Sequence, residues 1–221
     1  MTVLIVAAHP DDEVLGCGGT MAMLADAGES VHVLFVADGV SARGQSHLDT
    51  GLGARRAAAE RTMEILGAKA PVFLDYPDNR LDTVSLLDIA ISIEDRMRDL
   101  KPRCVYTHHH GDLNVDHRIV HQAVLTACRP LPGSTVSAIY GFETLSSTEW
   151  EAGGPSFDPR RWVDIEQTLE RKIAALEAYR EEMRPFPHAR SIENVRALAM
   201  YRGATVGRAA AEAFSVIREI V

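Results

Sequence analysis

Short apolar runs alternate along this chain with longer segments in which apolar residues recur every three or four positions. The short runs are rich in β-branched residues and predict strands over Val3–Ala8, Ser30–Ala37, Pro71–Leu74, Cys104–Thr107 and Thr135–Phe142. The first run is nearly continuous in apolar character, as a strand buried on both faces of a parallel sheet is. The pattern therefore predicts a mostly parallel, buried sheet.

The segments between these runs have the spacing of one helix face. They predict helices over Thr20–Ala27, Gly53–Leu66, Leu86–Leu100, His117–Cys128, Ile165–Met183 and Ile192–Met200. Residues 40–53 are polar and punctuated by glycine, so we expect a loop there. Strands that alternate with helices indicate a Rossmann-like α/β sandwich of three layers, and we expect one domain over residues 1–221.

Polar clusters follow two of the predicted strands at the points where those strands end. The first strand leads into His9-Pro10-Asp11-Asp12-Glu13, and the fourth leads into residues 108–117, which hold four histidines, two aspartates and an asparagine. Open α/β sheets bind their ligands outside the carboxyl ends of the strands. The two clusters therefore predict one shared site.

The residue types in these clusters favour a transition-metal ion. His9 and Asp12 are three residues apart on a tight loop and can converge on one cation, with His117 as the third ligand. Imidazole with carboxylate suits Zn²⁺ or Fe²⁺ better than Ca²⁺ or Mg²⁺, which prefer oxygen. Asp11 can act as a base on water at such a metal, and Asp116 can hold a histidine in its working tautomer. The alternatives are a helix-start acidic cluster and a solvated polar loop.

The composition and net charge of the chain limit the classes of molecule that it is expected to bind. The chain has 221 residues, 46% hydrophobic and 24% charged, which is ordinary for a globular protein. Its net charge of −8, from 23 basic and 31 acidic residues, disfavours nucleic acid and anionic membranes as partners. Three cysteines without CxxC spacing, no targeting segment and no long apolar run predict a cytoplasmic protein without membrane insertion. Assembly into a homo-oligomer stays open.

Two motifs resemble those of the PIG-L or LmbE-like family of zinc-dependent N-acetylglucosaminyl deacetylases. They are Ala8-His9-Pro10-Asp11-Asp12-Glu13 and Gly111-Asp112-Leu113-Asn114-Val115-Asp116-His117-Arg118. The resemblance implies an LmbE-like fold and removal of an N-acyl group, usually acetyl, from a small-molecule amino sugar or glycoconjugate. It also implies Zn²⁺ held by His9, Asp12 and His117, with Asp11 as the base. The same ligand set accepts Fe²⁺.

The family pattern implies further site residues. Arg55 matches an arginine that points at the substrate, Asp112 is expected to contact substrate, and His188 matches a histidine that reaches the active site. Several relatives have a histidine three residues before the distal ligand, where this chain has Asn114. An amide can donate a hydrogen bond to an oxyanion but cannot deliver a proton. The proton for the leaving amine would then come from Asp11 or from one of four histidines: His108, His109, His110 or His188.

Two other functions remain compatible with these residues. An amidase acting on a related thiol-sugar or another N-acyl conjugate would use the same site and differ in the acyl group. A non-catalytic α/β protein would bind the metal structurally, but structural zinc sites have four protein ligands and this sequence offers three obvious ones. A dinucleotide oxidoreductase is disfavoured because the glycines do not match GxGxxG.

Overall fold

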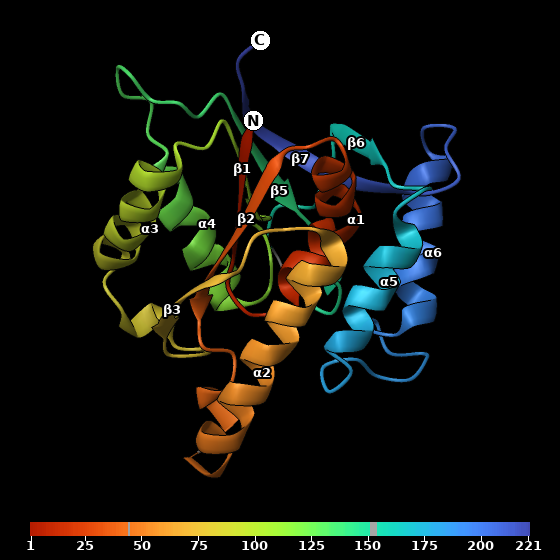
Figure 1. Ribbon diagram of the computed structural model, residues 1–221, viewed down its shortest axis with the longest axis horizontal. Helices are drawn as coiled ribbons and strands as arrows, with labels where there is room; N and C mark the ends of the chain where they lie inside the picture. Colours follow the sequence, from red (N-terminus) through yellow and green to blue (C-terminus); the bar gives the residue numbers. More distant parts are fainter. Residues whose placement is uncertain (44, 151–153) are drawn as a thin grey trace.

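The computed structural model describes residues 1–43, 45–150 and 154–221, and no side chain is described from 43 to 50. Within these residues, seven strands form one sheet in the order β3-β2-β1-β4-β5-β7-β6 (Figure 1). The strands are β1 (Thr2–Ala7), β2 (Ser30–Ala37), β3 (Val72–Tyr76), β4 (Cys104–His108), β5 (Ala138–Phe142), β6 (Arg161–Asp164) and β7 (Ala211–Glu219).

Strands β1 to β5 are parallel, and their spatial order is that of a Rossmann fold. In the centre of the sheet, Ile5 of β1 pairs with Val33 of β2 and with Tyr106 of β4. The predicted fold class is confirmed. The sequence pattern did not predict β7, which runs antiparallel to both β5 and β6 and extends the sheet at one edge.

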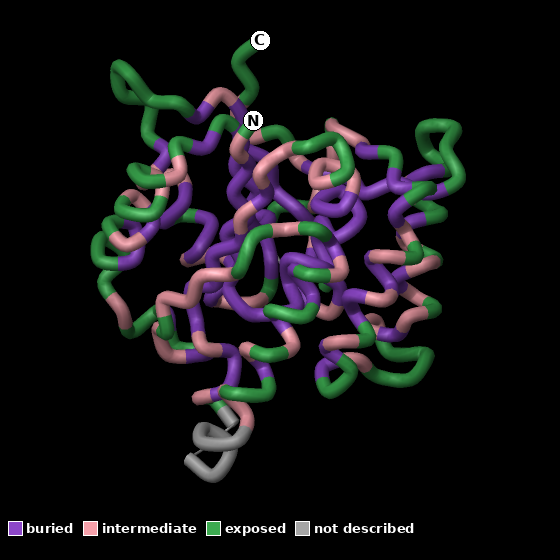
Figure 2. Tube along the Cα trace, viewed as in Figure 1, coloured by how far each residue is buried: buried purple, intermediate pink, exposed green. Residues whose placement is uncertain are grey.

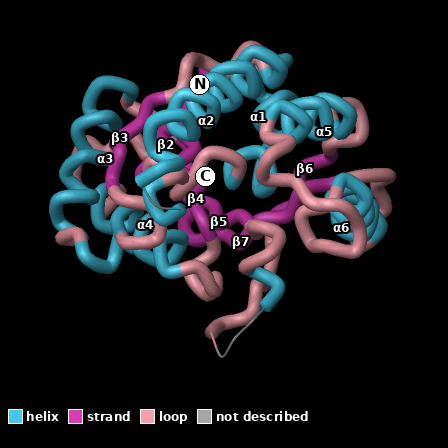
Figure 3. The backbone as a smooth tube through the Cα atoms, turned by 90° about the horizontal axis from the view of Figure 1, so that it is seen from below, coloured by secondary structure: helices cyan, strands magenta, loops and turns pink. Residues whose placement is uncertain are grey.

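Helices cover both faces of the sheet (Figures 1 and 3). One face carries α1 (Asp12–Asp26), α2 (Gln45–Leu66), α5 (Leu169–Ala178) and α6 (Ile192–Ala204), and the other carries α3 (Leu86–Leu100) and α4 (Val115–Ala127). An apolar layer lies between each set of helices and the sheet, so the central strands are buried along their length (Figure 2). No helix among the described residues is both long enough and apolar enough to cross a membrane.

Two helices begin earlier than their sequence pattern predicted. Helix α1 begins at Asp12 rather than Thr20 and runs through the glycines, with a kink at Cys17. A Cβ added at Gly16 would lie 2.3 Å from the Phe142 ring, so this glycine allows close packing rather than a loop. Helix α2 begins at Gln45, so much of the loop expected over 40–53 is helical.

A buried ion pair joins α1, α5 and β7. Lys172 Nζ lies 2.6 Å from Glu212 Oε1 and donates to the Leu15 carbonyl at 2.9 Å. Glu212 also accepts hydrogen bonds from the backbone N–H groups of Gly19 and Thr20, at 2.9 and 2.7 Å. These contacts fix the kinked start of α1, which carries the candidate site, against the rest of the fold.

Replacing Lys172 with methionine should destabilise the protein by about 3–5 kcal/mol, because a buried carboxylate is left without its cation. Urea denaturation followed by circular dichroism measures the free energy of unfolding. Arg171→Met is the matched control, since Arg171 pairs with the exposed Asp26 and its loss should cost at most about 1 kcal/mol. Equal costs for the two variants would show that the buried pair does not hold these elements together.

Candidate metal centre

The carboxyl ends of β1 and β4 bring together the three residues expected to bind a metal. His9 follows β1, Asp12 is the first residue of α1, and His117 lies in the first turn of α4, which follows β4. All three side chains are buried, and one potential ligand atom from each lies within 4.8 Å of the others. The parallel strands β1 and β4 are neighbours, which places the two polar clusters at one edge of the sheet.

Carboxylates orient both histidine rings. His9 Nε2 lies 3.0 Å from Asp116 Oδ2, and His117 Nδ1 lies 3.1 Å from Asp112 Oδ1. Ionised carboxylates only accept hydrogen bonds, so a metal bound to the other nitrogen of each ring would leave the N–H of the neutral ring on these two nitrogens. The other ring nitrogens, His9 Nδ1 and His117 Nε2, lie 3.2 and 3.3 Å from Asp12 Oδ2. Two ring nitrogens and one carboxylate therefore face the same small volume.

The buried polar atoms that lack a hydrogen-bond partner at this site fit a bound cation. Asp12 Oδ1 and His117 Nε2 are buried and have no hydrogen-bond partner among the described residues. Buried polar atoms almost always have a partner, and a cation between these atoms would supply one. Burial lowers the pKa of His117, but the Asp12 and Asp112 carboxylates raise it to about 9, so the cluster favours positive charge. Two nitrogens and a carboxylate suit Zn²⁺ or Fe²⁺.

Backbone N–H groups hold the Asp116 carboxylate in place, as His9 does. Its two oxygens accept hydrogen bonds from the N–H groups of Asn79 and Leu81, at 2.7 and 3.0 Å. A third carboxylate, Asp78, has Oδ1 3.1 Å from His9 Nε2. His9, Asp78 and Asp116 form a second group of potential metal ligands. We interpret this group as the support of the first, because Asp116 is already held by two backbone N–H groups and both carboxylates lie at the same His9 nitrogen.

Asp112 lies behind His117 and does not line the cavity beside Asp11 that is described below. Only 1% of its surface is exposed, and its Oδ2 accepts from Thr148 Oγ1 at 2.5 Å and from Ser147 Oγ at 3.0 Å. Burial raises the pKa of Asp112, but the hydrogen bond to His117 and the charge of that ring lower it to about 2. The placement suits an ionised carboxylate that orients His117, and it leaves no free oxygen for the expected substrate contact.

Asp11 is held from its backbone and from its side chain. Its φ of 125° is strained for a residue other than glycine, and its N–H donates to Glu13 Oε2 at 2.9 Å. Glu13 in turn accepts from the Tyr179 hydroxyl at 2.8 Å. Asp11 Oδ2 accepts from Arg190 Nη1 at 2.8 Å. Burial raises the pKa of Asp11, and the Arg190 guanidinium opposes that rise.

A cavity of about 170 Å³ opens beside this carboxylate. Arg55 and Asn114 line it, as expected from the sequence, together with His9, Asp11, Gly39, Ala42, Asp78, Asn79, Glu182 and Arg190. Asn114 caps α4 by accepting from the Asp116 N–H at 2.8 Å, and its Nδ2 lies 3.4 Å from Asn79 Oδ1. Nδ2 is the atom through which Asn114 could donate a hydrogen bond to a ligand.

The loop over residues 184–191 contributes a different side chain from the one expected. His188 is exposed, and its Nδ1 accepts from the Arg190 N–H at 3.0 Å. Arg190 reaches the cavity instead, where it bonds Asp11 and donates from Nε to Ser146 Oγ at 2.7 Å. Sequence reasoning missed Arg190, and its signal was a cation two residues after the expected histidine in the same proline-containing segment.

The other candidate proton donors lie away from the cavity lining. His108 Nε2 accepts from the Ala8 N–H at 2.8 Å, and its ring stacks on His117 with 3.9 Å between centroids. His109 Nε2 lies 2.9 Å from the Pro155 carbonyl oxygen. His110 is exposed on the same loop. None of these three histidines lines the cavity, whereas Asp11 does.

Comparisons with known proteins agree with this geometry. Residues 4–128 match the family model described as PIG-L: GlcNAc-PI de-N-acetylase. The chain is 33% identical over 184 residues to an uncharacterized deacetylase, YaiS, of Escherichia coli (strain K12), covering 80% of this chain and 90% of that one. It is 30% identical to 4-oxalmesaconate hydratase of Pseudomonas putida, covering 80% of this chain and 72% of the hydratase.

The fold also has close structural counterparts. The N,N′-diacetylchitobiose deacetylase of Pyrococcus horikoshii superposes with a TM-score of 0.78, covering 98% of this chain and 84% of that one. The two sequences are 24% identical, so this likeness concerns the fold alone.

Proposed function

This chain belongs to the PIG-L family, and from that premise we propose that it is a metal-dependent hydrolase removing an N-acyl group from a small amino sugar or sugar conjugate. The acyl group is most simply acetyl, and the metal is Zn²⁺ or Fe²⁺. One observation carries the proposal. His9 and His117, each oriented by a further carboxylate, present ring nitrogens to Asp12, whose other oxygen has no hydrogen-bond partner among the described residues, beside the Asp11 carboxylate.

The protein's own groups then have separate tasks. When bound, the metal supplies Lewis acidity toward the acyl oxygen and lowers the pKa of water. Asp11 accepts the proton of the attacking water and passes it to the nitrogen of the departing amine. Asn114 Nδ2 donates a hydrogen bond to the oxyanion of the tetrahedral intermediate. Because Asn114 cannot supply a proton, Asp11 carries both transfers.

Two cations and one carboxylate around the cavity complete the proposed site. Arg190 holds Asp11 in place and offsets the effect of burial, so that the carboxylate stays available as a base. Arg55 and Asp78 also line the cavity and are suited to hydrogen-bond sugar hydroxyls. Asp112 and Asp116 keep the two histidines in the tautomers that leave a lone pair for the metal.

Changing either orienting carboxylate to its amide should weaken metal binding without unfolding the protein. We expect Asp112→Asn and Asp116→Asn each to raise the dissociation constant for Zn²⁺ by about 10–100-fold. Competition with a chromophoric chelator measures this constant. Asp82→Asn is the control, because Asp82 is exposed next to Leu81, which Asp116 contacts. Unchanged affinity in both test variants would contradict the positioning role.

The direct test of the function is acetate release from a panel of N-acetylated amino sugars by the Zn²⁺- and Fe²⁺-loaded protein. We expect turnover of N-acetylglucosamine or one of its conjugates, and one metal ion per chain. A metal-loaded protein that hydrolyses no N-acyl substrate would overturn the proposed reaction while leaving the metal centre.

The hydratase relative makes addition of water to a carbon–carbon double bond the second candidate. A metal with a carboxylate base can serve that reaction as well as amide hydrolysis. Loss of absorbance by a conjugated, unsaturated tricarboxylate such as 4-oxalmesaconate would detect it. Hydratase turnover without acetate release would favour this candidate over the deacetylase.

A further inference from the structure

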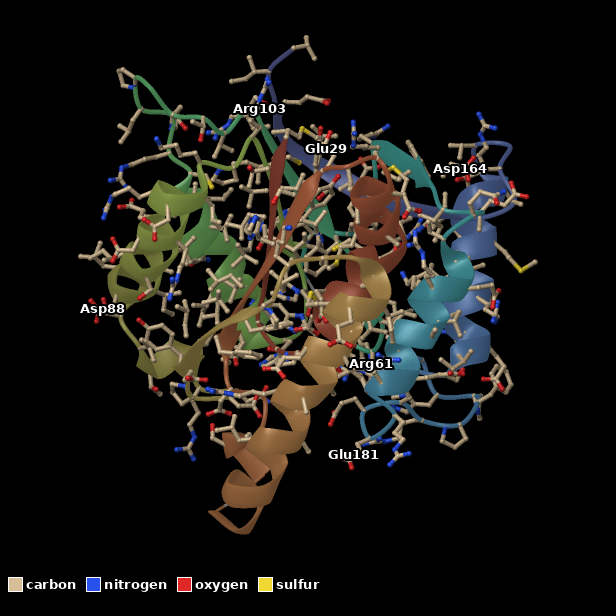
Figure 4. All side chains as sticks on the ribbon, in the orientation of Figure 1. Glu29, Arg61, Asp88, Arg103, Asp164 and Glu181 are labelled. Carbon is tan, nitrogen blue, oxygen red and sulfur yellow. The ribbon has the colours of Figure 1, made fainter. Side chains whose placement is uncertain are left out.

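A cavity of about 230 Å³ lies at the end of the sheet where the parallel strands begin, opposite the candidate metal centre. Part of its lining is apolar and comes from β1, α1 and β6, through Val3, Met23, Leu24 and Val163. Arg103, which precedes β4, also lines it and is exposed, so the cavity reaches the surface there. Figure 4 labels Arg103 at this end of the molecule.

The cavity also holds a guanidinium group that is only partly paired. Arg161 of β6 lies over the ring of Tyr140, with 4.6 Å between its guanidinium carbon and the ring centroid. Its Nη1 is 3.4 Å from Glu219 Oε1, an oxygen that also accepts from the Tyr140 hydroxyl at 2.7 Å. Arg161 Nε is buried and has no hydrogen-bond partner among the described residues. Because buried donors almost always have a partner, this nitrogen favours an acceptor that a ligand brings.

The charge of the lining favours an anion. The whole chain has a net charge of −8, but two guanidinium groups, those of Arg103 and Arg161, line this cavity with the single carboxylate of Glu219. That carboxylate is shared between Arg161 and Tyr140. The cavity is therefore a locally cationic place on an acidic protein, and it can draw in a small anion.

We propose that this cavity binds a small carboxylic acid with one carboxylate and an apolar body. An ionised carboxylate accepts two parallel hydrogen bonds from one guanidinium group, which suits Arg161. The apolar body can pack against Met23, Leu24 and Val163. At about 30 Å³ for a water-sized group, the cavity holds about eight non-hydrogen atoms, the size of benzoate.

Other classes of small ligand fit the lining less well. An ammonium group would face two guanidinium groups, and a neutral amide would forgo the attraction to them. The second carboxylate of a dicarboxylic acid would be buried against the apolar side chains of Val3, Met23 and Leu24. The proposal does not depend on N-acyl hydrolysis, because no residue lines both this cavity and the one beside Asp11.

Calorimetric titration with benzoate and with benzamide, its uncharged isostere, tests the role of charge. We expect the unaltered protein to bind benzoate at least about tenfold more tightly than benzamide. Arg161→Met should remove that difference. Arg160→Met is the matched control and should keep it, because Arg160 is exposed, pairs with Asp158 and does not line the cavity. Equal binding of the two probes by the unaltered protein would overturn the proposal, as would no binding at about 10 mM benzoate.

A second variant tests the place of binding and leaves every charge intact. Ser137 lines the cavity and is only partly buried, so Ser137→Trp can fill the cavity from the surface. It should weaken benzoate binding by about tenfold or more. Ser134→Trp should leave binding unchanged, because Ser134 is exposed on the same segment and does not line the cavity. If Ser137→Trp binds benzoate as the unaltered protein does, the carboxylate lies elsewhere and the proposed site is wrong.

The metal centre is the other place where a carboxylate could bind. Because the cavity lies at the opposite end of the sheet, chelator-treated and Zn²⁺-loaded protein should bind benzoate with the same dissociation constant. Binding that appears only with the metal would assign benzoate to the metal centre and overturn the site at Arg161. Equal binding in both forms, lost in Arg161→Met, would support the site whatever reaction the metal centre performs.

Discussion

Asp11→Asn should lower kcat/KM for the N-acyl substrate by about 10²–10⁴-fold, the usual contribution of a positioned general base. The amide cannot accept the proton of water and cannot return it to the amine. Asparagine keeps the shape of the side chain and tolerates positive φ better than most residues, so the strained backbone at this position should survive. Turnover of acetate and metal content per chain are the two measurements.

The metal content distinguishes the role of Asp11 from that of its neighbour. Asp11 donates its own N–H to Glu13 and pairs with Arg190, whereas Asp12 faces both histidines. The variant should therefore bind metal as the unaltered protein does. Asp75→Asn is the control, since this aspartate also has positive φ but is exposed at the end of β3. A variant that keeps a third of the activity, or one that loses its metal, would rule out Asp11 as the base.

Removing the metal, or the His117 imidazole that faces it, should lower kcat/KM by about a thousandfold or more. Lewis-acid stabilisation of the developing charge is worth several kcal/mol, and each 1.36 kcal/mol is about tenfold in rate. A chelator should abolish turnover in the unaltered protein, and added Zn²⁺ or Fe²⁺ should restore it. His117→Ala should stay inactive under the same additions.

Thermal unfolding checks the same centre without relying on activity. Zn²⁺ at a hundred times its dissociation constant should stabilise the unaltered protein by about 2.7 kcal/mol, because the ion binds the folded chain. His117→Ala should lack that response, whereas His110→Ala, which changes an exposed histidine between β4 and α4, should retain it. If neither metal changes the thermal unfolding of the unaltered protein, the proposed metal centre is wrong.

Much of the site could be predicted from the sequence, because each of its parts consists of residues that are close together in the chain. A buried strand followed at once by His9, Asp11 and Asp12 places those residues at the carboxyl edge of a parallel sheet, whatever the rest of the chain does. The same reasoning brought His117 to that edge after β4. The structure brings these residues together as expected.

The sequence could not predict in the same way which carboxylate would hydrogen-bond to which histidine. Asp112 and Asp116 stand four residues apart in one motif, and the sequence could not say which histidine each would orient. In the fold, α4 turns Asp116 toward His9 across the two strands and leaves Asp112 behind His117. The choice depends on the direction in which the first turn of α4 points, which is set by packing against β1 and β4 and not by spacing.

The sequence by itself determined the alternation of the five parallel strands with helices, the fold class and the cluster at the strand ends, because apolar periodicity and strand-end chemistry are local properties. Only the tertiary structure decided that α1 begins among its glycines, that β7 pairs antiparallel with β5, and that Arg190 contacts Asp11 from 179 residues away. Such contacts follow from how whole elements pack, since helix faces and sheet edges bring distant residues together without any mark in the sequence near either one.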